Sequence, residues 1–96
     1  MPKAYWISFY QQINDPAKYA AYVKLAAPAI LAGGGRFLAR GVAERAFDAG
    51  SKQRVTVVEF ESVEAAIATH EGAAYQAALA ALADGIIRDL RIVAGE

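Results

Sequence analysis

Few side chains in this sequence could carry acid–base chemistry near neutral pH. His70 is the only imidazole among the 96 residues, and imidazole is the side chain whose unperturbed pKa lies near neutrality. It could serve as a general base in a cleft beside a sheet, provided that a substrate comes within hydrogen-bond reach. The structural alternative is a helix-terminal histidine stabilised by the helix dipole. Because only Glu71 lies nearby in the sequence and there is no second histidine, we expect no metal site at His70.

Glu59 is the second candidate base. It falls on an otherwise apolar face of a predicted strand, Arg54–Phe60. A carboxylate in such a place is either paired or raised in pKa, and a raised pKa would mark a functional site. The alternatives are an ion pair with Arg36, Arg40 or Arg54, or exposure at the end of the strand.

Arg36 and Arg40 suggest anion binding, because they follow three consecutive glycines, residues 33–35. Arginine forks and free backbone amides together suit a carboxylate. The glycines are not a phosphate loop, since they follow a predicted helix and lack the lysine. The simpler interpretation is a helix stop followed by solvated arginines.

Four aromatic residues, Trp6, Tyr10, Tyr22 and Tyr75, could line a cavity between a sheet and its helices. Aromatic side chains at strand and helix spacing usually form core, which is the alternative. Buried tyrosine hydroxyls still need partners, so a polar pocket is compatible with either interpretation.

These residues need elements to position them. Residues Ala4–Ile13 are rich in aromatic and β-branched types, and large apolar groups occur at both odd and even positions, which predicts a strand covered on both faces. Asp15 and Pro16 then predict a helix start, as N-cap and first helical residue. Pro28 should kink this helix or end its regular part.

The rest of the chain predicts two more strands, a broken helix and a last strand. The second strand begins at Arg36, is interrupted at Gly41 and continues from Val42 to Phe47. The remaining predicted elements are a turn at 48–51, a strand at 54–60, a helix from Ser62 that breaks at Gly72, a second helical piece from about Ala73 to Leu82, and a strand at 89–93.

This order, β-α-β-β-α-β, predicts an α+β, ferredoxin-like fold: a four-stranded antiparallel sheet with helices on one face. The other sheet face would also be apolar, and a second copy is its simplest cover. The sequence therefore predicts a homodimer in which two sheets form a dimeric α/β barrel.

Composition narrows the classes of function. The length predicts a single domain over residues 1–96. A net charge of zero without a basic cluster argues against nucleic-acid binding. Without cysteine there is no thiolate chemistry. No apolar run has the length of a membrane span and no cofactor motif occurs, so the sequence predicts a cytoplasmic protein that needs neither membrane nor cofactor.

Several motifs together resemble the DUF1330 family over nearly the whole chain. They are Tyr5-Trp6, Asp15-Pro16 with Tyr19 and Tyr22, the block from Gly34 to Gly41, residues 54–60, Ala65-Ala66, Tyr75 to Ala78 and residues 88–93. The resemblance implies a dimeric α/β barrel and no assigned function. Where relatives often carry Trp or Tyr after the second-helix alanines, this chain has Thr69-His70.

Three functions fit these expectations. The first is binding or transformation of a small organic molecule between sheet and helices, with His70 or Glu59 abstracting a proton and Arg36 or Arg40 holding the anion. This first hypothesis rests on an analogy of fold, because dimeric α/β barrels include cofactor-free monooxygenases. The second is a non-catalytic ligand-binding or accessory dimer. The third is a structural dimer with a sealed barrel interior.

Overall fold

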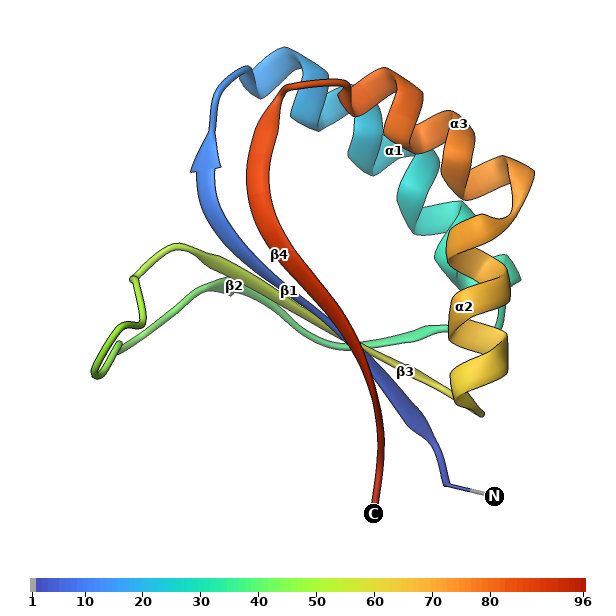
Figure 1. Ribbon diagram of the computed structural model, residues 1–96. Helices are drawn as coiled ribbons and strands as arrows, with labels where there is room; N and C mark the ends of the chain where they lie inside the picture. Colours follow the sequence, from blue (N-terminus) through green and yellow to red (C-terminus); the bar gives the residue numbers. More distant parts are fainter. Residues whose placement is uncertain (1) are drawn as a thin grey trace.

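In the computed structural model, which describes residues 2–96, one antiparallel sheet is covered on one face by helices (Figure 1). The elements follow in the order β1 (Ala4–Ile13), α1 (Pro16–Ala32), β2 (Arg36–Val42), β3 (Arg54–Phe60), α2 (Val63–Glu71), α3 (Ala73–Leu82) and β4 (Ile86–Ala94). The predicted α+β, ferredoxin-like arrangement is confirmed.

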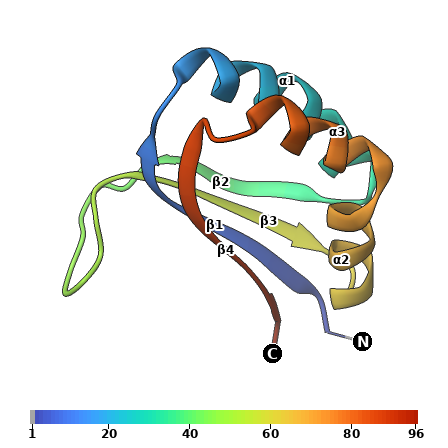
Figure 2. The ribbon, with the colours of Figure 1, turned by 45° about the horizontal axis from the view of Figure 1, so that its top comes forward.

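The sheet has the strand order β2-β3-β1-β4, so β1 lies inside it between β3 and β4. Both neighbours of β1 run antiparallel to it, with Trp6 opposite Val58 on one side and Ile92 on the other. All three helices lie on the same side of the sheet, as the two views together show (Figure 2). The other face has no cover within residues 2–96.

Strand β1 has the two apolar faces that its sequence predicts, but the chain covers only one of them. Trp6, Ser8 and Tyr10 are buried beneath the helices. Ile7 is half-buried on the opposite face, and Phe9 is exposed there.

Helix α1 begins as the sequence predicts. The Asp15 side chain accepts hydrogen bonds from the backbone N–H groups of Ala17 and Lys18, at 3.0 and 3.2 Å, and Pro16 is the first helical residue. The helix runs through Pro28 to Ala32, so the proline does not end it. Gly34 follows the helix with a φ of 92°, a conformation that glycine adopts without strain.

The second and fourth strands differ in length from their predictions. Strand β2 ends at Val42, and the predicted continuation to Phe47 is wrong because residues 43–53 form a connection that extends away from the sheet (Figure 2). The irregularity in β2 falls between Phe37 and Ala39, where the register shifts, and not at Gly41. Strand β4 begins at Ile86, three residues before the predicted start.

The predicted helix break is confirmed at Gly72, which separates α2 from α3. The core lies between these helices, α1 and the sheet, and its largest fully buried aromatic side chains are Trp6, Tyr75 and Phe60. No helix in residues 2–96 is long and apolar enough to cross a membrane.

Candidate functional site

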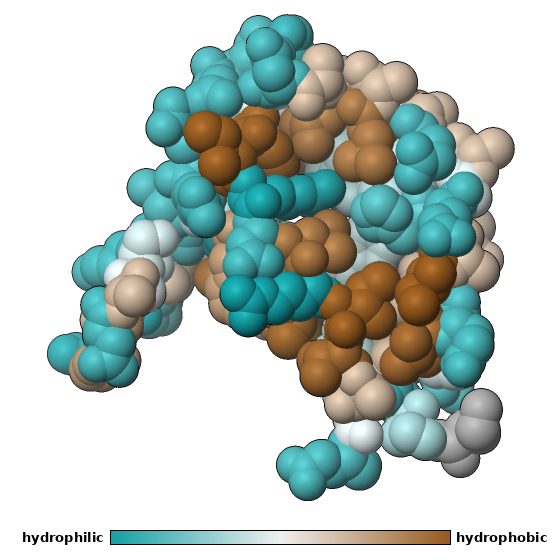
Figure 3. Space-filling view, in the orientation of Figure 1, coloured by the Kyte–Doolittle hydropathy of each residue, from teal (hydrophilic) through white to brown (hydrophobic). Residues whose placement is uncertain are grey.

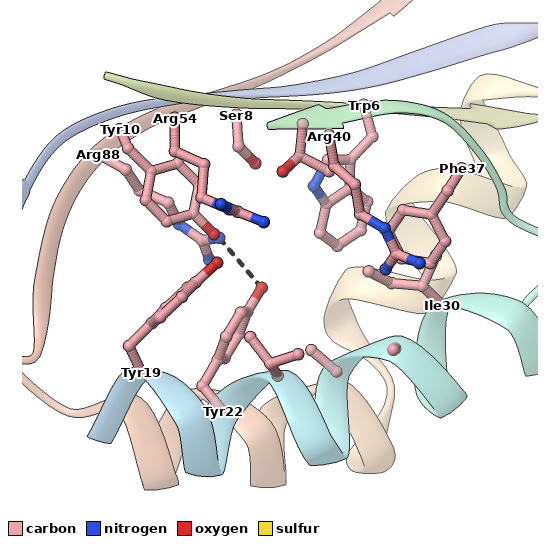
Figure 4. Close-up of a pocket in the computed structure, with 14 residues that line it drawn as sticks. Trp6, Ser8, Tyr10, Tyr19, Tyr22, Ile30, Phe37, Arg40, Arg54 and Arg88 are labelled. Carbon is pink, nitrogen blue, oxygen red and sulfur yellow. Dashed lines mark hydrogen bonds between the residues drawn. The ribbon is translucent and has the colours of Figure 1, made fainter. Parts of the chain in front are cut away.

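A cavity of about 250 Å³ lies between the helix-covered face of the sheet and α1 (Figure 4). The sheet and α1 contribute most of its wall: Trp6, Ser8, Tyr10, Tyr19, Tyr22, Val23, Ala26, Ala27, Ile30, Phe37, Arg40, Arg54, Thr56 and Arg88. Strand alternation explains the set, since residues 6, 8 and 10 of β1 and 54 and 56 of β3 share the face that α1 covers.

Three arginines are the charged residues of this wall. Arg40 lies on β2, Arg54 begins β3 and Arg88 lies near the start of β4. No aspartate or glutamate of residues 2–96 lines the cavity, and none forms an ion pair with any of the three arginines. The wall therefore carries a net positive charge and no carboxylate that would neutralise it.

Arg54 is the least satisfied of the three. Its side chain reaches from the sheet into the space above α1 (Figure 4). Its Nε atom is buried without a hydrogen-bond partner within the described chain. A buried N–H without an acceptor is rare in folded proteins, and it leaves this end of the Arg54 side chain in an unfavourable environment.

Arg40 lies on the edge strand and is exposed at the side of the cavity. Its guanidinium carbon is 4.2 Å from the centre of the Phe37 ring, a cation–π contact that holds the side chain over the cavity wall. The stacked arginine keeps its N–H groups available for an anion.

Arg88 joins two buried phenols into one cluster. It donates hydrogen bonds to the hydroxyl oxygens of Tyr22 (3.0 Å) and Tyr75 (2.8 Å), and the two hydroxyls are 2.7 Å apart. Burial raises the pKa of Tyr22 well above its ordinary value, against the opposing effect of Arg88. Burial alone would lower the pKa of Arg88, but its interactions with Tyr22 and Tyr75 outweigh burial and raise it. The Tyr22 phenol and the Arg88 guanidinium thus keep their protons at neutral pH.

Tyr10 and Tyr19 complete the aromatic side of the cavity, with their rings in edge contact at 5.7 Å between centroids. Burial, followed by Tyr19 and Tyr22, raises the pKa of Tyr10, so this phenol is also neutral. Together with Trp6 and Phe37, these rings make a wall that suits a flat ligand.

His70, the predicted base, does not line the cavity. It lies half-buried in the last turn of α2 with its ring 5.4 Å from that of Trp6 and 5.0 Å from that of Tyr75. Burial, and then the charge of Arg88, lowers its pKa below the ordinary value. The imidazole is therefore neutral, but the core aromatics separate it from the space where a ligand would lie.

Glu59 and Arg36 lie on the opposite, uncovered face of the sheet. Glu59 is opposite Tyr5 of β1 and Arg36 of β2. Its carboxylate accepts a hydrogen bond from the Tyr5 hydroxyl at 3.4 Å and pairs with Lys3 at 3.5 Å, and not with an arginine. The predicted base and the predicted anion-holding arginine therefore have no access to the cavity.

The structure thus brings four of the eight predicted site residues together. One cavity is lined by Trp6, Tyr10, Tyr22 and Arg40. Tyr75 does not line it, but its hydroxyl is hydrogen-bonded to that of Tyr22. His70, Glu59 and Arg36 lie elsewhere.

Two residues of the cavity wall, Arg54 and Arg88, were not among the site residues predicted from the sequence. The sequence suggests Arg54 only as an ion-pair partner for Glu59, although alternation along its strand puts it on the face opposite to Glu59. Arg88 preceded the predicted last strand. Its signal was the continued alternation with Leu90 and Ile92, which places an arginine on the core face of β4.

Comparison with solved structures supports the fold. The RPA0582 protein of Rhodopseudomonas palustris, described as of unknown function, has a TM-score of 0.81 at 15% identity, over 100% of this chain and 82% of that one. SnoaB, a cofactor-independent oxygenase from Streptomyces nogalater, has a TM-score of 0.70 at 9% identity, over 100% and 95%. A dimeric ferredoxin-like protein of unknown function from Thermobifida fusca has a TM-score of 0.66 at 19% identity, over 97% and 91%.

At these identities the likeness concerns the fold alone. No curated protein matches the chain. The domain family of unknown function DUF1330, in contrast, matches residues 3–96, nearly the whole sequence. This chain therefore belongs to the DUF1330 family.

Proposed function

We propose that this protein binds a small organic anion with an aromatic part in the cavity between the sheet and α1. The observation that carries the proposal is the wall with three arginines, Arg40, Arg54 and Arg88, and no carboxylate among the described residues. A bound anion would supply the missing counter-charge.

Electrostatics favour this occupant over a neutral one. Guanidinium groups taken out of water lose hydration, and like charges near one another in a partly dry cavity repel. An anionic ligand reverses both effects, because it accepts charge-assisted hydrogen bonds from arginine forks.

The shape of the cavity limits the rest of the ligand. Its volume of about 250 Å³ is below the ~300–1,000 Å³ of sites for drug-sized compounds. Trp6 and Phe37 offer flat apolar surfaces, while Ser8 and Thr56 add hydroxyls. A substituted single aromatic ring with an ionised oxygen fits this combination.

The geometry supports binding more directly than catalysis. Among the described residues that line the cavity there is no imidazole and no carboxylate, so no side chain of the wall is suited to remove a proton at neutral pH. The arginines instead favour the ionised form of a bound acid and lower its pKa. We therefore favour the non-catalytic ligand-binding protein over an enzyme that deprotonates its substrate.

Binding of 4-nitrophenol tests the proposal, because its anion absorbs visible light and its neutral form does not. We expect the bound probe to show the anion band at a pH where the free probe is mostly neutral. The methyl ether 4-nitroanisole, which cannot ionise, should bind at least about tenfold more weakly by calorimetry, a loss typical of one charge-assisted hydrogen bond. Benzoate and its amide form a second such pair.

Variants link the binding to the arginines. Arg40→Met and Arg54→Met should each weaken both anions, whereas Lys24→Met, an exposed cation of α1 outside the cavity, should not. Neutral analogues that bind as tightly as the anions, anion binding insensitive to the arginines, or no anion binding at millimolar concentration would each overturn the proposal.

We also propose that two copies pair through the uncovered sheet face. Its central positions are apolar, with Ile7 opposite Val57, and Phe9 is 43% and Val93 51% exposed. Apolar side chains reach the surface around strand β4 as well (Figure 3). Arg91 and Asp89 form an ion pair on the same face, so a twofold partner meets charges of both signs. The dimeric protein from Thermobifida fusca has the same fold.

Native mass spectrometry of freshly purified protein tests the pairing and reports any retained ligand. We expect a dimer for the native chain and a monomer for Phe9→Glu. Leu31→Glu changes a residue of α1 that is 58% exposed and should leave the dimer intact. A monomeric native chain at micromolar concentration would refute this part of the proposal.

We propose that the protein is located in the cytoplasm, which cell fractionation would test.

A further inference from the structure

We propose that the Tyr22 hydroxyl donates a hydrogen bond to an oxygen of the anion bound in the cavity. Tyr75 and Arg88 orient the Tyr22 O–H toward the cavity, because both donate hydrogen bonds to the Tyr22 oxygen. The inference rests on the proposed function and deepens it. It specifies what kind of ligand atom can lie beside the Tyr22 hydroxyl.

The hydrogen bonds around the two phenols leave few arrangements for the protons. A phenol hydroxyl donates one hydrogen bond and accepts up to two. Arg88 has no acceptor, so its N–H groups donate to the oxygens of both Tyr22 and Tyr75. The contact of 2.7 Å between the two hydroxyls then needs one donor, which is either Tyr22 or Tyr75.

If Tyr22 donated, the proton of Tyr75 would need another acceptor. The Tyr75 side chain is 0% exposed, and its hydroxyl has no further hydrogen-bond partner within residues 2–96. Its proton would be buried and unsatisfied, which costs free energy. This arrangement is therefore unfavourable.

If Tyr75 donates, every group is satisfied. Tyr75 then accepts from Arg88 and donates to Tyr22, and Tyr22 accepts from both neighbours. The one proton without a partner is that of Tyr22, whose side chain lines the cavity. Figure 4 shows its hydroxyl pointing from α1 into the space below the sheet. Water or a ligand can accept the proton there.

This arrangement makes the part of the cavity beside the Tyr22 hydroxyl selective. Both acceptor positions of the Tyr22 oxygen are taken, so a ligand can only accept a hydrogen bond from it. An ionised oxygen, as in a phenolate, an enolate or a carboxylate, fits; an ammonium or an amide N–H does not. Tyr22 is thus a binding residue, and Tyr75 and Arg88 are positioning residues that act through it.

Two substitutions separate the two proton arrangements, with 4-nitrophenol as the probe. Tyr22→Phe should weaken binding of the 4-nitrophenolate anion about 10- to 150-fold, as expected for a hydrogen bond to a charged group. It should also raise the pH at which the bound probe ionises. Tyr75→Phe should weaken binding only about two- to fivefold, because Tyr22 loses a polarising donor but still donates to the ligand. Binding of 4-nitroanisole should change little in either variant.

The opposite proton arrangement gives the opposite pattern. Tyr22→Phe would then hardly affect the anion, and Tyr75→Phe would tighten its binding by freeing the Tyr22 proton for the ligand. Either result would overturn the inference.

Tyr5→Phe, on the other sheet face, is the matched control and should bind like the native chain. Arg54→Met separates the two proposals, because anion binding that depends on Arg54 but not on Tyr22 contradicts only this inference. No anion binding at all would overturn both.

Discussion

Replacing Arg54 by methionine should stabilise the ligand-free protein while it weakens anion binding. The Nε atom of Arg54 is buried without a partner in the described chain, and an unsatisfied buried donor costs about 1–3 kcal/mol. Methionine keeps a long apolar stem against the cavity wall and removes both this donor and one of three like charges. We therefore expect the free energy of unfolding to rise by about 1–2 kcal/mol.

Thermal unfolding followed by circular dichroism measures this change at one fixed chain concentration, since pairing of chains would make the midpoint depend on concentration. A gain of that size corresponds to a rise in Tm of about 4–8 °C for each kcal/mol. Lys24→Met is the control and should change stability by no more than about 0.5 kcal/mol. Arg54→Lys should keep part of the anion binding, because it keeps the charge.

A lower Tm for Arg54→Met would refute the reasoning. It would mean that Arg54 makes favourable interactions in the free protein and is not held in an unfavourable state that a ligand relieves. An unchanged Tm combined with full loss of anion binding would contradict the magnitude but not the binding role.

Three further predictions concern the framework of the site. The pKa of His70 lies below its ordinary value of 6.5. As the pH drops below about 6.5, the unfolded chain therefore binds this proton before the folded chain does, and the free energy of unfolding should fall. Urea unfolding at pH 7.5 and 5.5 should show this fall in the native chain and a smaller one in His70→Phe. Gly35→Ala would place a Cβ 2.6 Å from Cγ2 of Ile30 and should cost about 1–3 kcal/mol, whereas Gly41→Ala, which meets nothing within 4 Å, should not destabilise. Asp15→Ala removes the acceptor for two N–H groups of α1 and should cost about 1 kcal/mol in the same assay; an unchanged midpoint would contradict the cap.

Local chemistry was sufficient to predict most of the elements. Residues Ala4–Ile13 form β1 with the predicted ends, and Asp15 with Pro16 begins α1 as predicted. These signals work because capping and strand alternation depend on residues close together in the chain. The continuation of β2 to Phe47 failed because its apolar residues, without a neighbouring strand to pair with, form an exposed connection instead.

The cavity was partly predictable in the same way. Trp6, Tyr10 and Tyr22 could be recognised as aromatic residues at core spacing, and the fold put them in one wall. Glu59 looked similar to a site residue in sequence, but strand parity alone could not say which face the helices cover. That decision depends on the connections between all four strands.

The sequence by itself determined the order of elements, the ferredoxin-like fold and a set of aromatic residues with unmet polar needs. Only the tertiary structure decided which charges meet. Arg40, Arg54 and Arg88 are far apart in the chain and lie on three different strands, so no local pattern links them. Sheet register brings them to the face of the sheet on which α1 lies. Their convergence without a carboxylate is a property of that packing, and it favours the anion binding proposed above over proton removal by His70 or Glu59.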